Sequence, residues 1–231
     1  MALFVLGDPH LSIGCDKPMD VFGGWEDYVE KIRSNWCATV GIDDTVVLAG
    51  DISWGMTLEE ARPDFAFLHE LPGKKIILKG NHDYWWTTRR KIEEFFAKNG
   101  FYSLNILHNN CFAVDNIAVC GTRGWILETG AAFDAKIVNR EAMRLEASLK
   151  EALRTGLEPF VFLHYPPVYG NEVCAPIMDI LKEYVVRRCY YGHIHSTGIA
   201  NAVRGYYRGI MMRLISCDAI GFAPLKVETD I

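Results

Sequence analysis

The sequence lacks the patterns that mark membrane, secreted and low-complexity proteins. No apolar run approaches the roughly 18 residues that a membrane-spanning helix needs. The apolar stretch 2–6 is too short for a signal peptide and has no basic residues before it. No segment is repeated or of biased composition. We therefore expect a soluble, cytoplasmic protein without a membrane partner.

The sequence also lacks paired cysteines. Its seven cysteines are odd in number, scattered, and never spaced as Cys-x-x-Cys. This pattern disfavours a disulfide framework and a thiolate metal site. We expect buried free thiols in a reducing compartment.

Basic residues are fewer than acidic ones. The chain has 24 Lys and Arg against 29 Asp and Glu, a net charge of −5. Such a balance disfavours a whole-surface electrostatic attraction to nucleic acid, although it allows a local basic site. With 231 residues, half of them apolar, the chain can bury a core of its own. Disordered, collagenous and coiled-coil classes are excluded.

Short aliphatic runs alternate with helical patterns. Six runs predict buried strands, at Ala2–Leu6, Thr45–Ala49, Lys75–Lys79, Ile117–Cys120, Phe160–Leu163 and Arg188–Tyr191. Between them, the pattern predicts helices near 25–36, one that starts at 57, and others near 88–98, 145–153 and 177–184. Pro63 is expected to break or restart the second of these. The alternation predicts parallel strands in a layered α/β fold.

The later part of the chain departs from this alternation. Residues 124–156 are interpreted as a loop–helix insertion within a single domain spanning 1–231. The tail 198–228 has no helical period, so we expect antiparallel strands there. Within it, Arg204, Tyr206, Tyr207 and Arg208 predict an exposed hairpin.

Polar residues that bind metals follow five of the predicted strands. They lie in Gly7-Asp8-Pro9-His10, Gly50-Asp51, Gly80-Asn81-His82-Asp83, the single His164, and Gly192-His193-Ile194-His195. The carboxyl ends of strands in open α/β sheets meet at one crevice, so these residues are expected to converge. Four of the groups begin with a glycine, which allows a tight turn around a small ion.

The residue types indicate two divalent ions. Imidazole, carboxylate and one amide oxygen suit Mn, Fe or Zn better than Ca or Mg. Seven candidates exceed what one tetrahedral ion needs: Asp8, His10, Asp51, Asn81, His164, His193 and His195. Two divalent ions, two carboxylates and a hydroxide leave a net charge of about +1, which favours a phosphate anion.

In this order, the five groups resemble the calcineurin-like metallophosphoesterases. The blocks of that family are Asp-x-His, Gly-Asp, Gly-Asn-His-Asp/Glu, a lone His, and Gly-His-x-His, and the resemblance spans residues 8–195. It implies a four-layer α/β/β/α sandwich with a two-metal centre. It also implies that one ion is held by Asp8, His10 and His195, the other by Asn81, His164 and His193. Asp51 would bridge the two ions, and His82, oriented by Asp83, would be an outer catalytic histidine.

Two departures from the family pattern narrow the expected activity. Asp51 is followed by Ile52-Ser53-Trp54, without the Asp-Arg pair of the protein phosphatases, and Asp83 stands where those enzymes carry Glu. Both favour the small bacterial phosphodiesterases, phosphomonoesterases and pyrophosphatases. The expected reaction is in-line attack of a metal-bridging hydroxide on a small phosphate ester. His82 would protonate or stabilise the leaving oxygen.

Two alternative functions stay open at this stage. A nuclease is disfavoured by the lack of overall basic charge, and a non-catalytic protein-binding scaffold by the complete set of ligands together with His82.

Several other side chains are ambiguous in the sequence. Arg123 is a candidate phosphate ligand, with a surface ion pair as the alternative. Trp54, Trp85 and Trp86 either stack on substrate or pack behind the metal loops. His69 and His108 match no block and are expected to be packing or surface residues.

Overall fold

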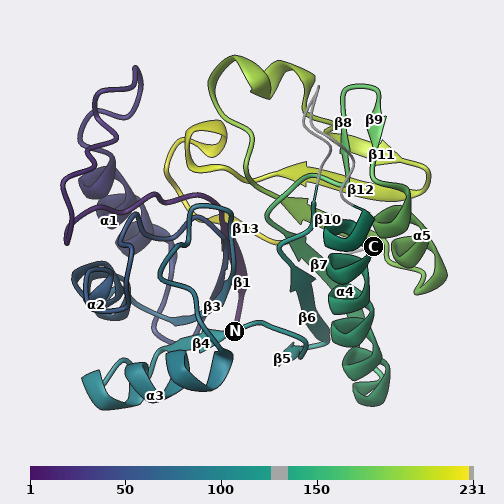
Figure 1. Cartoon of the computed structure of the whole chain (residues 1–231), viewed down its shortest axis with the longest axis horizontal. Helices are drawn as coiled ribbons and strands as arrows, with labels where there is room; N and C mark the ends of the chain where they lie inside the picture. The colour runs from purple at the N-terminus through teal and green to yellow at the C-terminus, as the bar shows by residue number, and fades with distance from the viewer. Residues whose placement is uncertain (126–134, 229–231) are drawn as a thin grey trace.

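The protein is described by a computed structural model that covers residues 1–125 and 135–228. Two β-sheets lie face to face at the centre, and helices cover the outer face of each (Figure 1). The layer order is therefore helix, sheet, sheet, helix. This confirms the predicted α/β/β/α sandwich.

The first sheet has the strand order β13-β1-β2-β3-β4. β1 to β4 are parallel to one another, and β13 is antiparallel to β1. Their bounds are β1 Leu3–Leu6, β2 Thr45–Ala49, β3 Lys74–Leu78, β4 Leu104–Ile106 and β13 Leu225–Lys226. The carboxyl ends of β1, β2 and β3 thus lie at one edge.

The second sheet has the order β11-β12-β10-β7-β6-β5. Its four inner strands are parallel, and the two edge strands are antiparallel to their neighbours. The bounds are β5 Phe112–Val114, β6 Ile117–Thr122, β7 Glu158–Leu163, β10 Arg188–Tyr191, β11 Gly205–Tyr207 and β12 Ile210–Leu214. A short ribbon of β8 Val168–Tyr169 and β9 Glu172–Val173 stands apart. All six predicted strands are present.

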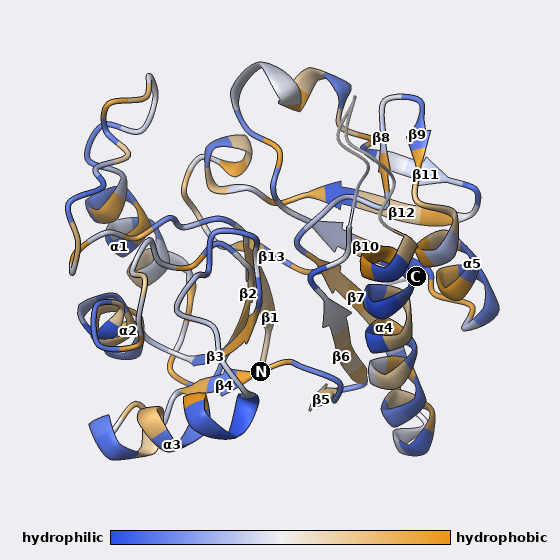
Figure 2. Cartoon of the chain, in the orientation of Figure 1, coloured by the Kyte–Doolittle hydropathy of each residue, from blue (hydrophilic) through white to orange (hydrophobic). Residues whose placement is uncertain are grey.

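The central strands consist largely of apolar residues (Figure 2), and their side chains fill both faces of each sheet. In β1, Phe4 and Leu6 pack against the outer helices, whereas Leu3 and Val5 face the other sheet. The same alternation separates Val161 from Phe160 and Phe162 in β7. Because successive side chains point to opposite faces, a continuous apolar run is what a strand buried on both sides requires.

Three helices cover the first sheet and two cover the second (Figure 1). Those of the first are α1 Tyr28–Thr39, α2 Arg62–Glu70 and α3 Arg89–Asn99, and those of the second are α4 Ala135–Thr155 and α5 Ala175–Glu183. Pro63 lies in the first turn of α2, where a missing N–H costs nothing, so the predicted restart is confirmed. Thr88 caps α3, and Gly100 ends it in a left-handed conformation.

The tail differs in part from its prediction. β11 and β12 form the expected hairpin through Arg208 and Gly209, and Tyr206 is exposed. However, β12 is parallel to β10, since the hairpin turns the chain back along that strand. Two 3₁₀ helices, Ser196–Asn201 and Cys217–Ile220, also interrupt the tail. An all-antiparallel tail was therefore wrong.

The predicted insertion falls partly on residues outside the described ranges. Residues 126–134 are not described, and α4 accounts for most of the remainder. α4 packs along β6 and β7 and supplies Leu145 and Leu149 to the core. The single-domain interpretation and the insertion stay predictions.

All seven cysteines are free. Cys120, Cys174, Cys189 and Cys217 are buried, as predicted. Cys37 is exposed, and Cys15 and Cys111 are partly so, which contradicts the expectation for these three. Within the described residues, no helix is both long and apolar enough to cross a membrane.

Candidate metal centre

Two groups of predicted ligands lie at the carboxyl ends of the strands. Asp8, His10 and His195 form one group, and Asp51, His164 and His193 form the other. Within each group, the potential ligand atoms all lie within 4.8 Å of one another. The residues come from loops after β1, β2, β7 and β10, so strand ends of both sheets contribute. Six of the seven predicted ligands thus gather in two clusters.

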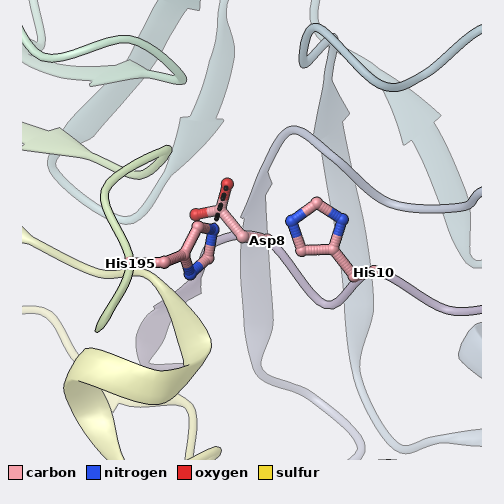
Figure 3. A group of neighbouring side chains, drawn as sticks. All are labelled: Asp8, His10 and His195. Atoms are coloured by element: carbon pink, nitrogen blue, oxygen red, sulfur yellow. Dashed lines mark ion pairs between the residues drawn. The ribbon is translucent and has the colours of Figure 1, made fainter. Parts of the chain in front are cut away.

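The first group leaves one imidazole nitrogen ready for a cation. His195 Nε2 lies 3.7 Å from Asp8 Oδ1 (Figure 3). The other ring nitrogen, Nδ1, lies 2.8 Å from Asp218 Oδ1, which orients the ring. His195 Nε2 is buried and has no hydrogen-bond partner among the described residues. A cation bound beside Asp8 would satisfy this orphaned atom.

Asp51 lies between the two groups. Its Oδ2 is 3.5 Å from His164 Nε2 in its own group and 3.7 Å from His10 Nε2 in the other. Asn81, the seventh predicted ligand, joins the second group, because its Oδ1 is 2.6 Å from His164 Nε2. His164 Nδ1 is held 3.1 Å from the carbonyl of Ala49. The rings of His164 and His195 are thereby each fixed by one nitrogen.

The glycines before these ligands are required by close approach of a carboxylate. A Cβ on Gly80 would lie 2.1 Å from Asp51 Oδ1, and one on Gly192 would lie 2.3 Å from Asp8 Oδ2. Both distances are far below van der Waals contact, so a side chain at either position would push the carboxylate away. The sequence explained these glycines by tight turns. In the structure, their main role is to make room for ligands of a different loop.

Four predicted ligands have strained backbone conformations. Asp8, His10, Asp51 and His193 all have φ between 46° and 69°, in the left-handed region. Such conformations are uncommon for residues other than glycine and cluster at functional sites. Hydrogen bonds hold them in place. For example, His193 N–H donates to both Asp8 oxygens at 2.9 and 3.0 Å.

Electrostatics in the cluster favour a bound cation. Burial and the neighbouring Asp8 carboxylate raise the pKa of Asp51 to about 8. Burial and the charge of His164 lower the pKa of His193 to about 3, so its ring stays neutral. Burial opposes a charge on His195, yet the facing carboxylates of Asp218 and Asp8 raise its pKa to about 10, so a metal ion bound there would replace a proton. Two buried carboxylates among four imidazoles are a donor set that fits divalent transition metals.

Asp83 has partners other than the one predicted. Its carboxylate accepts N–H bonds from Gly80 at 2.7 Å, Ile52 at 2.8 Å and Asp51 at 3.0 Å. Ser53 N–H and Trp85 Nε1 donate to it as well. The side chain is buried, and burial together with Asp51 raises its pKa to about 7. Asp83 therefore joins two metal loops, whereas the sequence suggested that it orients the His82 ring.

His82 lies at the rim of the centre. Its ring is half-buried, 4.5 Å from the Trp54 ring and 5.9 Å from the His10 ring. Tyr84 Oη is 3.4 Å from Nδ1, and the His82 N–H donates to Asp51 Oδ1 at 2.7 Å. Burial and nearby His164 lower the pKa of His82. Burial therefore disfavours the doubly protonated ring, and the neutral ring can still donate one N–H.

The tryptophans have different roles. Trp85 is buried and donates to Asp83, so it packs behind the loops. Trp54 is half-buried and stacks on His10 at 5.0 Å, which places it beside the first group. Trp86 lines a cavity together with Lys79 and Arg123, and none of the predicted metal ligands lines it.

Arg123 follows β6 and lies mostly within the protein. Its Nη2 is 3.7 Å from Glu141 Oε1. Its Nε is buried and has no hydrogen-bond partner in the described part of the chain. The guanidinium also lies 5.0 Å from the Trp125 ring. The ion pair that was the alternative to phosphate binding is thus present, but its partner Glu141 is buried and not at the surface.

Sequence reasoning missed Asp218. This residue lies shortly after β12 and holds both His195 Nδ1 and the N–H of Ser196, at 2.8 and 2.9 Å. A polar residue after a strand was the signal used for the other groups, and it was present here. It was overlooked because the tail was interpreted as antiparallel strands, whose ends would not meet at this edge.

The chain is similar in sequence to one protein family and to a curated phage protein. The family model described as calcineurin-like phosphoesterase matches residues 1–197. Among curated proteins, the Gene 66 protein of Mycobacterium phage L5 is 34% identical over 76 residues. That match covers 32% of this chain and 36% of the phage protein, so the chain spans about a third of that relative.

Solved structures share the fold at low sequence identity. TT1561 of Thermus thermophilus has a TM-score of 0.59 and 12% identity, with 99% of this chain and 98% of that chain covered. Phosphopantetheinyl hydrolase from Mycobacterium tuberculosis has a TM-score of 0.55 and 15% identity, with 99% and 96% covered. A protein of unknown function from Aquifex aeolicus, AQ665, has a TM-score of 0.53 and 14% identity, with 97% and 95% covered.

Proposed function

Because the chain belongs to the calcineurin-like phosphoesterase family, we propose that it hydrolyses small phosphate esters at a two-metal centre. One observation carries this proposal. Two groups of buried histidine and aspartate side chains lie at the strand ends, with Asp51 between them. This is the arrangement that two cations sharing one carboxylate require.

The ligand assignment follows from the two groups. Asp8, His10 and His195 would hold one ion, and Asn81, His164 and His193 the other, with Asp51 shared. The nitrogen-rich donor set favours Mn, Fe or Zn. When bound, the pair of ions supplies Lewis acidity, an activated water nucleophile and neutralisation of the charge that develops on phosphorus.

The chain's own residues complete the reaction. His82 stands at the rim, beside both groups, where it donates a hydrogen bond or a proton to the leaving oxygen. Because the nucleophile would be water, in-line displacement of the leaving oxygen would require no covalent enzyme intermediate. Arg123 has one buried N–H, at Nε, without a hydrogen-bond partner among the described residues, and it would bind an anionic group of the substrate. Asp83 keeps the loops of Asp51 and Asn81 in register.

Charge favours small substrates over nucleic acid. The net charge of −5 gives no general attraction to a polyanion, which counts against a nuclease. Phosphopantetheinyl hydrolase, which is similar in fold, is by its name a hydrolase of a small phosphorylated group. Both groups of metal-binding residues are complete, which counts against a non-catalytic scaffold. We further propose a single domain acting in the cytoplasm.

A substrate panel tests this proposal. Protein loaded with Mn²⁺, Fe²⁺ or Zn²⁺ is assayed on small phosphomonoesters, phosphodiesters and pyrophosphates, and in parallel on a phosphopeptide and on plasmid DNA. We expect kcat/KM to be highest for a small ester and to vanish on chelation. A much higher value on plasmid or phosphopeptide would contradict the small-substrate proposal, and no hydrolysis of any ester would support the scaffold.

A further inference from the structure

A cavity of about 710 Å³ lies at the carboxyl ends of β3, β4 and β6. We call it the basic pocket. Its walls include Lys79, Trp86, His108, Arg123, Glu141 and Arg144. It belongs to the same edge of the sheets as the metal centre, on the side of β4 and β6. Its residues were not part of the predicted metal ligands.

The basic pocket has more positive charge than its own carboxylate neutralises. Glu141 is fully buried and accepts from Arg144 Nη1 at 2.6 Å and from Thr122 Oγ1 at 2.7 Å, with Arg123 Nη2 at 3.7 Å. Lys79 has no ion-pair partner within the described residues. The pocket therefore contains three cationic side chains, of which two pair with its single carboxylate. Arg89 and Arg90 also line the cavity, but each pairs with a glutamate of α3 and is not counted.

Two further features of the basic pocket favour an anion. Arg123 Nε is buried without a hydrogen-bond partner in the described part of the chain, although a guanidinium donor normally finds an acceptor. The amino end of α3 also faces the cavity, through Thr87 and Thr88. Unpaired N–H groups at a helix start attract negative charge. A phosphate-sized anion would satisfy both.

The basic pocket is joined to the metal centre through the backbone. Lys79 directly precedes the Gly80-Asn81 block. On the second sheet, the Arg123 carbonyl accepts N–H bonds from His164 at 3.2 Å and Tyr165 at 2.8 Å. The backbone of the basic pocket is therefore hydrogen-bonded directly to the loop that carries the ligand His164. The rings of Trp86 and His108, with centroids 6.1 Å apart, add an aromatic wall against which the organic part of a substrate could pack.

We propose that the basic pocket is a second phosphate subsite, which binds an anionic group of the substrate while the ester to be cleaved lies at the metal centre. This inference rests on the proposed function and narrows it. The favoured substrates are small molecules that carry a second phosphate group besides the one hydrolysed. His108, expected to be a packing residue, becomes part of a binding wall.

Binding of non-hydrolysable probes tests the subsite without relying on turnover. Alkane bisphosphonates of increasing chain length, and alkyl monophosphonates of equal carbon number, are titrated calorimetrically into Mn²⁺-loaded protein. We expect at least one bisphosphonate to bind about tenfold or more tightly than its matched monophosphonate, which corresponds to about 1.4 kcal/mol. Lys79→Gln and Arg144→Gln should abolish most of this difference.

A matched variant controls for charge and folding. Arg154 makes the same ion pair with Glu151 on α4, also at 2.6 Å and three residues apart, but far along the helix and exposed. Arg154→Gln should keep the full bisphosphonate preference. Melting temperature and metal content are measured for all three variants. Lys79→Gln, which breaks no ion pair among the described residues, keeps the test valid if Arg144→Gln does not fold.

The outcomes separate this inference from the proposed function. If no bisphosphonate exceeds its monophosphonate, or the preference survives in Lys79→Gln and Arg144→Gln, the subsite is wrong even where esters are hydrolysed. If the preference is found and lost in these variants while no ester is hydrolysed, the anion site stands and the proposed function fails.

Discussion

Single residues around the ligands decide how well a cation is held. Asp218 touches no predicted ion, yet it fixes His195 by accepting from Nδ1 at 2.8 Å and leaves Nε2 free. Carboxylates in this position set the ring orientation and raise the basicity of the ligand nitrogen. His82 also lies outside both groups, at the rim, but it orients no ligand ring.

Asp218→Asn should weaken metal binding at the group of Asp8 and His195. We expect a loss of about 10–100-fold in affinity, because an amide is a poorer partner for the His195 ring. Competition with a metal-chelating dye measures this. Asp43→Asn, at an exposed aspartate, is the control. Unchanged affinity in the Asp218 variant would mean that its contact with His195 is only structural.

His82→Ala should slow ester hydrolysis, and the loss should be larger when the alcohol is a poorer leaving group. On an alkyl phosphate ester we expect a loss in kcat of about 10²–10⁴-fold, because the departing oxygen needs a donor. On a p-nitrophenyl ester the loss should be clearly smaller, since nitrophenolate leaves unaided. His69→Ala is the control, and metal content is checked. Equal losses on both esters at full metal occupancy would argue against a donor role.

At the scale of elements, the metal loops depend on ties between strands. Asp83 links the turn after β2 to the turn after β3 through hydrogen bonds from Asp51, Ile52 and Gly80. Asp83→Ala would leave several buried N–H groups unpaired. Each such group costs about 1–3 kcal/mol.

Asp83→Ala should therefore lower the free energy of unfolding by at least about 3 kcal/mol. Urea denaturation measures this change. Asp16→Ala is the control, because Asp16 is exposed and lies far along the chain from both turns. If Asp83→Ala keeps full stability and loses activity only on esters with poor leaving groups, then Asp83 acts through His82, as first expected.

Strand β3 carries a buried amine that makes stability depend on pH. Lys75 is fully buried, and its ammonium group donates to the carbonyls of Leu71 and Gly73. Burial lowers its pKa from 10.5 to about 8. Between these values the unfolded chain binds more protons than the folded one. Stability should therefore rise as pH increases through this window.

The rise should amount to at most about 3 kcal/mol between pH 8 and 10.5. Lys75→Met should remove it, whereas Lys74→Met, at the exposed neighbour, should not. The free energy of unfolding is measured in urea across the pH range for both variants. The difference between the two variants isolates the contribution of Lys75. A parallel pH dependence in both variants would show that Lys75 is not the cause.

For the whole molecule, the sequence pattern predicted the layers of the fold well, but it predicted the hydrogen bonds between loops less well. Runs such as Thr45–Ala49 are apolar almost throughout because both faces of β2 are covered, so their identity as strands was readable. Strand ends converge by geometry, so the clustering of Asp8 with His195 was also predictable. The partners of Asp83 were not, because most of its donors lie on a different loop and only the folded chain brings them within reach.

The residues of the basic pocket were likewise not predictable as a group from the sequence. Lys79, Arg123 and Arg144 are 65 residues apart in sequence from first to last and follow no shared motif. Their meeting depends on α4 lying over β6, which places Arg144 and Glu141 beside the end of that strand. Only Arg123 carried a signal, as an arginine directly after a strand.

The central claim is that two groups of side chains hold two ions that share Asp51. Metal content after loading with Mn²⁺ and desalting tests it most directly. We predict about two ions per chain for the natural sequence. Asp51→Asn should hold fewer and should lose at least about 100-fold in phosphodiester hydrolysis, while its melting temperature in chelator stays the same, because burial already favours a neutral group there. One ion or none at saturation in the natural protein, or two ions and full activity in Asp51→Asn, would contradict the claim.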